Sequence, residues 1–98
     1  MDDQELPPEA SPEIGVYLSG KRRSATLVEF SAQFANVELN ERAPLWFGML
    51  VVVSIGNFPG FAGYVRAIEG TSMVIEFQPE LHLSVVASVN ERCFGSVG

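Results

Sequence analysis

The chain has 98 residues, of which 47% are apolar, and a formal net charge of −6 at pH 7. This length fits one domain of ordinary size, and this apolar content is enough to fill one buried core. An acidic chain lacks the broad cationic face that displaces counterions from phosphates, so the charge argues against binding of DNA or RNA.

The first 13 residues form an acidic segment. They include five carboxylates, three prolines and no cation. Their few apolar side chains bury too little surface to offset the entropy of ordering the chain. We therefore predict a flexible acidic arm over residues 1–13 and one β-rich domain over residues 14–98.

The next segment gathers half of the chain's six cations. Ile14–Leu18 fits a short strand, and Ser19–Gly20 starts a turn that carries Lys21, Arg22 and Arg23 at or near its tip. Adjacent cations at a turn usually form a solvated loop, but they also suit a small anion. If the chain binds an anion, we expect the site here.

Five further strands are indicated by alternating apolar residues and by the turn residues between them. They cover residues 24–30, 34–39, 45–55, 61–68 and 72–77. Gly70 is expected to adopt a positive φ in the hairpin between the last two strands. Residues 45–55 are apolar on both faces, which predicts a strand covered on both sides.

Four aromatic side chains lie in or beside these strands, at Trp46, Phe47, Phe58 and Phe61. Their surface is large enough to cover a ligand or a partner. Packing in the core and against the loops is the favoured interpretation, because large aromatic side chains are usually buried.

After Pro79, apolar residues recur at spacings of about three and four, at Leu81, Val85, Val86, Val89 and Cys93. This spacing predicts an amphipathic helix over Glu80–Cys93. A strand through Leu83–Val89 is the alternative, because valine is abundant there. Short antiparallel strands followed by one helix describe an all-β fold, either a small barrel or a sandwich.

Residues that support catalysis are scarce. His82 is the only histidine and Cys93 the only cysteine, so the sequence supplies neither a nucleophile with its base nor the ligands of a zinc site. We expect no enzyme activity, no metal and no cofactor. One cysteine, no export signal and no apolar run near 20 residues favour a cytoplasmic protein without membrane insertion.

The order of several short motifs resembles the PilZ domain, a bacterial module whose usual ligand is cyclic di-GMP. The motifs are Ala43-Pro44-Leu45 with Gly48, then Gly63-Tyr64-Val65-Arg66, then Ile75-Glu76-Phe77, then Pro79-Glu80-Leu81-His82. The resemblance spans roughly residues 14–89. It implies a small antiparallel six-stranded β-barrel with a short C-terminal helix.

Both motifs with which the family binds cyclic di-GMP are incomplete in this chain. One reads aspartate or asparagine, any residue, serine, any two residues, glycine, and its matching positions hold Glu29, Ser31 and Phe34. A phenyl ring in place of that glycine should block the close approach of a base. The other motif, two arginines four positions apart, does not occur anywhere in the sequence.

The resemblance implies one of two functions. The favoured one is a degenerate, non-catalytic PilZ-like domain that acts as a protein-interaction or adaptor module, with an unidentified protein partner. The alternative is a working cyclic di-GMP receptor with an unusual site formed by Lys21, Arg22, Arg23, Glu29 and Ser31. The missing arginine pair and the phenylalanine at the glycine position favour the adaptor.

Overall fold

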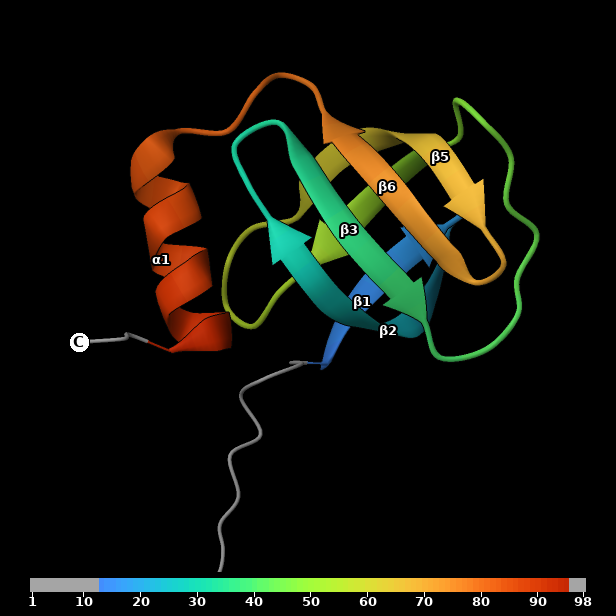
Figure 1. The fold of residues 1–98 in the computed structure, drawn as a ribbon, viewed down its shortest axis with the longest axis horizontal. Helices are drawn as coiled ribbons and strands as arrows, with labels where there is room; N and C mark the ends of the chain where they lie inside the picture. Colours follow the sequence, from blue (N-terminus) through green and yellow to red (C-terminus); the bar gives the residue numbers. More distant parts are fainter. Residues whose placement is uncertain (1–12, 96–98) are drawn as a thin grey trace, which may run out of the picture.

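The computed structural model describes residues 13–95. The elements in chain order are β1 (Glu13–Leu18), β2 (Lys21–Phe30), β3 (Phe34–Leu39), β4 (Leu50–Ser54), β5 (Phe61–Glu69), β6 (Ser72–Phe77) and α1 (Leu83–Phe94). Neighbouring strands are antiparallel in the order β1-β2-β3-β6-β5-β4, and β4 pairs with β1 to close a barrel (Figure 1). The predicted all-β barrel of six antiparallel strands with a C-terminal helix is confirmed.

Alternation along the strands fills the barrel with apolar side chains. In β3, Ala35, Val37 and Leu39 are buried, whereas Asn36 and Glu38 lie on the outer face, as predicted. Successive side chains of a strand point to opposite faces, so every second residue enters the barrel. Bulges interrupt this alternation between Leu27 and Glu29 in β2 and between Val65 and Ala67 in β5. Within residues 13–95 the core contains no polar or charged side chain.

The C-terminal segment forms a helix, as the spacing of its apolar residues predicts, and the alternative of a strand is wrong. The helix begins at Leu83 and not at Glu80, because the backbone of His82 is extended (φ −70°, ψ 141°). Val89 and Cys93 are its buried residues. Among the residues described, no helix has the length and apolar character needed to cross a bilayer.

Helix α1 lies against one end of the barrel (Figure 1). The amide Nδ2 of Asn90 donates a 3.1 Å hydrogen bond to the carbonyl oxygen of Phe30, which ties the helix to the end of β2. The rings of Phe30, Phe61 and Phe77 pack together at this end, with centroids 5.4 to 6.2 Å apart. Tilted rings at such distances attract one another beyond their burial alone.

Two predicted boundaries are wrong near the N-terminus. Glu13, assigned to the acidic arm, is the first residue of β1 and pairs with Thr26. The rest of that predicted arm, residues 1–12, lies outside the described residues. Strand β2 begins at Lys21, because Ser19 and Gly20 with φ of 53° and 81° complete the turn between them. The cations therefore form the start of the strand that follows the turn, with Lys21 directly after Gly20.

The prediction that residues 45–55 form a strand covered on both sides is wrong. Strand β4 spans only Leu50–Ser54. Val51 and Val53 face the core, while Leu50 is 57% exposed and Val52 is half-buried on the outer face. The apolar residues of the outer face do not form a second core, because no other element in residues 13–95 packs over them.

The expected burial of the aromatic residues holds for only part of the set. Phe61 is buried and Phe58 packs half-buried against the core. Trp46 and Phe47 are 52% and 67% exposed, so the prediction that they anchor the core is wrong for these two. They lie in the 40–49 segment, which joins β3 to β4.

Candidate functional site

The three cations predicted to bind an anion lie at the start of β2, but they do not face one point. Arg22 is opposite Tyr17 of β1, and Arg23 is opposite Val16. Val16 is buried in the core whereas Tyr17 lies on the outer face. Paired residues project to the same side of a sheet, so Arg22 and Arg23 project to opposite sides, and Lys21 projects with Arg23.

The two arginines have different surroundings. The guanidinium of Arg22 lies against the backbone of Gly15, and a Cβ atom at Gly15 would be 2.5 Å from Arg22 Cζ. Arg23 is half-buried, and its Nε has no hydrogen-bond partner within residues 13–95. The only ion pair within that range joins Arg66 to Glu76.

The positions that match the family's serine motif lie around the turn between β2 and β3. The backbone N–H of Phe34 donates a 3.1 Å hydrogen bond to Ser31 Oγ, and the Ser31 hydroxyl lies 3.1 Å from the Phe34 carbonyl oxygen, to which it donates. The backbone N–H of Ser31 donates to the same carbonyl at 2.8 Å. The Ser31 hydroxyl is therefore occupied in holding its own turn.

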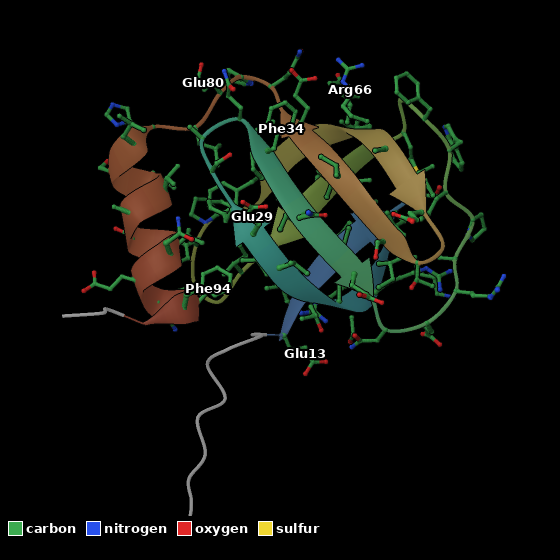
Figure 2. All side chains as sticks on the ribbon, viewed as in Figure 1. Glu13, Glu29, Phe34, Arg66, Glu80 and Phe94 are labelled. Carbon is green, nitrogen blue, oxygen red and sulfur yellow. The ribbon has the colours of Figure 1, made fainter. Side chains whose placement is uncertain are left out.

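A small cavity lies beside this turn, and Figure 2 shows Glu29 and Phe34 at this part of the barrel. The cavity has a volume of about 190 Å³ and is lined by Glu29, Ser31, Phe34, Ala35, Asn36 and Val74. Small-molecule pockets usually measure roughly 300 to 1,000 Å³. The space next to Phe34 is therefore too small to enclose a cyclic dinucleotide.

The two halves of the predicted site lie at opposite ends of β2. Glu29 follows Arg23 by six residues along the strand. At the rise of roughly 3.3 Å per residue in a strand, this places their backbones about 20 Å apart. The structure therefore does not bring Lys21, Arg22 and Arg23 together with Glu29 and Ser31.

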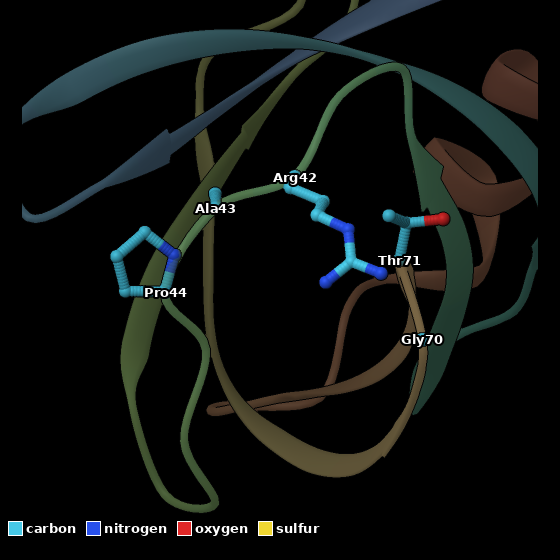
Figure 3. A pocket seen from close by; sticks show the side chains of 5 residues that line it. All are labelled: Arg42, Ala43, Pro44, Gly70 and Thr71. Carbon is cyan, nitrogen blue, oxygen red and sulfur yellow. The ribbon is translucent and has the colours of Figure 1, made fainter.

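A polar pocket at the β5–β6 turn was not predicted from the sequence. It has a volume of about 510 Å³ and is lined by Arg42, Ala43, Pro44, Gly70 and Thr71 (Figure 3). The Thr71 hydroxyl donates to Glu38 Oε2 at 3.4 Å, so a carboxylate lies beside this pocket. The sequence carries no pattern that predicts this pocket, because the 40–49 segment and the β5–β6 hairpin meet only in the folded barrel.

A larger apolar groove on the outside of β1 and β4 was also missed; we name it the β1–β4 groove. It has a volume of about 620 Å³ and is lined by Tyr17, Ser19, Gly20, Trp46, Met49, Leu50, Val51 and Val52. The apolar outer positions of residues 45–55 are its signal in the sequence, because Leu50 and Val52 line the groove instead of lying under a second layer.

His82 and Cys93, the only histidine and the only cysteine of the sequence, lie at opposite ends of α1. His82 is exposed, with its Nδ1 3.3 Å from Ser84 Oγ. Cys93 is buried, and this burial raises the pKa of its thiol, while the charge of Arg92 acts in the opposite direction. Within residues 13–95 no three histidine, cysteine, aspartate or glutamate side chains group so as to hold a metal ion.

No protein-family model matches this chain, and no curated protein matches it. The resemblance to PilZ domains thus stays an interpretation that rests on the order of the motifs.

Proposed function

We propose that this chain is a degenerate, non-catalytic PilZ-like domain that acts as a protein-interaction or adaptor module in bacterial cyclic di-GMP signalling. The separation of Lys21, Arg22 and Arg23 from Glu29 and Ser31 by about 20 Å along β2 carries the proposal. In a nucleotide site the cationic and the polar side chains must contact the same ligand. Here β2 holds these two sets of side chains apart.

Three further observations support this function. The closed six-stranded barrel with a C-terminal helix is the architecture that the resemblance implies. The hydroxyl of Ser31 is used within its own turn. The ring of Phe34 lies beside the small cavity, at the position where the family has a glycine.

A second candidate is a cyclic di-GMP receptor, and one observation favours it. The Nε of Arg23 lacks a hydrogen-bond partner within residues 13–95, and an anion at the start of β2 would supply an acceptor. Such a site would use the cations of β2 without Glu29 or Ser31.

Calorimetric titration of the full chain with cyclic di-GMP tests the proposal. We expect no binding tighter than about 100 µM, because the cations of β2 point to two sides of the barrel wall. Micromolar binding of cyclic di-GMP that is lost on Arg22→Ala or Arg23→Ala, but kept by Arg92→Ala, would establish the receptor function. It would refute the adaptor function. Arg92→Ala is the matched control, since it removes the same charge from α1.

A further inference from the structure

We propose that the β1–β4 groove is the partner-binding surface of this domain, and that it binds an acidic protein segment carrying large apolar side chains. This inference rests on the proposed role as a protein-interaction module. It names the surface used and the chemistry of the partner.

The groove presents apolar side chains to water where the fold does not require them. Tyr17, Trp46 and Leu50 are 39%, 52% and 57% exposed, and all three line the groove. Tyr17 is directly opposite Val52 in the β1–β4 register, so their side chains share the outer face. Contiguous exposed apolar side chains of this kind mark interaction surfaces in soluble proteins.

The closed barrel determines how a partner can bind here. Strand β1 pairs with both β2 and β4, and β4 pairs with both β1 and β5. A partner strand therefore finds no free edge to which it could add its own backbone hydrogen bonds. The partner must bind through side chains, and a groove of about 620 Å³ has room for more than one large apolar side chain.

The charge next to the groove selects an acidic partner. No carboxylate lines the groove, and Lys21 projects to the other side of the sheet, together with Arg23. Arg22 is opposite Tyr17 on the outer face, with its guanidinium against the backbone of Gly15. A carboxylate beside the apolar anchor of a partner would meet Arg22, which favours association and correct orientation.

The same charge argues against a second copy of this chain as the occupant. A two-fold symmetric contact uses the same surface on both molecules, so it would bring two copies of Arg22 close together. Like charges that meet at an interface cost free energy. A different, acidic chain is therefore the occupant that fits the groove.

Binding in the groove can be followed by tryptophan fluorescence, because Trp46 is the only tryptophan of the chain. The probe is the synthetic peptide Asp-Glu-Leu-Phe-Asp-Glu, which has no tryptophan. On titration into the full-length protein, we expect the Trp46 emission to move to shorter wavelength as the groove loses water, with a Kd of about 10 to 100 µM. Two matched peptides, with lysine at the acidic positions or serine at the apolar positions, should bind at least about tenfold more weakly.

Variants of the protein locate the binding site. Leu50→Ser should weaken binding of the acidic peptide at least about tenfold. Arg22→Glu should weaken it by a similar factor without altering the apolar lining of the groove. Leu83→Ser, which changes a residue 74% exposed on α1, and Arg92→Glu are the matched controls and should bind as the unchanged protein does. Both Leu50 and Arg22 are exposed, and thermal melting followed by circular dichroism checks that each variant is folded.

Four results would overturn the inference. One is equal binding of the lysine peptide, and another is unchanged affinity of both Leu50→Ser and Arg22→Glu. The third is self-association in sedimentation that Leu50→Ser abolishes, which would make a second copy the occupant. Absence of both peptide binding and cyclic di-GMP binding would refute the inference alone, whereas micromolar cyclic di-GMP binding would refute the proposed function and leave the peptide result unaffected.

Discussion

Two glycines of the barrel wall lie under close neighbours that differ in how easily they move. A Cβ atom at Gly15 would be 2.5 Å from the Arg22 guanidinium, the far end of a flexible side chain. A Cβ atom at Gly63 would be 2.6 Å from the backbone oxygen of Glu76 and 2.7 Å from Ile75 Cγ2. The arginine can swing away, whereas the backbone of β6 can retreat only by weakening its pairing with β5.

The substitutions Gly15→Ala and Gly63→Ala are therefore expected to differ in cost. Gly63→Ala should lower the free energy of unfolding by about 2 kcal/mol, because it overpacks a rigid contact. Gly15→Ala should change it by less than about 0.5 kcal/mol. Urea denaturation of the two variants measures both values, and similar losses would show that Arg22 is held in place as firmly as the β6 backbone.

The sequence matched Phe34 to a glycine of the PilZ motif but did not specify its surroundings. This match rests on spacing, which is a property of the chain itself. The hydrogen bonds between Ser31 and Phe34 depend on the conformation of the β2–β3 turn, which the spacing does not specify.

Helix α1 contributes to the core through a narrow stripe of residues. Val89 is fully buried, whereas Leu83 at the start of the same helix is 74% exposed. The periodicity of the sequence predicted Val89 in that stripe, because side chains three and four residues apart share one face of a helix.

Substitution of Val89 and of Leu83 by alanine should distinguish the contribution of packing to the free energy of unfolding from that of helix propensity. Val89→Ala should reduce the free energy of unfolding by about 2 kcal/mol, because it leaves a cavity under the helix. Leu83→Ala should change it by less than about 0.5 kcal/mol, because its side chain is in water in the folded protein. Chemical denaturation followed by circular dichroism measures both, and an equal effect of the two would contradict docking of α1 on the barrel end.

Closure of the barrel is a property of the whole molecule. Each of the six strands has two neighbours, so none of them has a free edge. The pairing of β1 with β4 completes the ring and joins segments separated by about 30 residues.

Hydrogen exchange tests this closure. The paired amides of β1 and β4 should exchange on the order of a thousandfold or more slowly than unpaired amides of the 40–47 segment, and about as slowly as those of β2. Measurement by NMR resolves individual amides. Fast exchange in β4 together with slow exchange in β2 would mean that the barrel opens between β1 and β4.

The sequence by itself determined the local structure of this protein. Strand alternation, the helical spacing of Val85, Val89 and Cys93 and the turn at Gly70 follow from backbone periodicity and from the φ that glycine tolerates, and these act over a few residues. The tertiary structure alone decided which side chains meet. Adjacent Arg22 and Arg23 project to opposite sides because β2 is a strand in a closed wall, and the outer face of β4 forms a groove because no described element covers it.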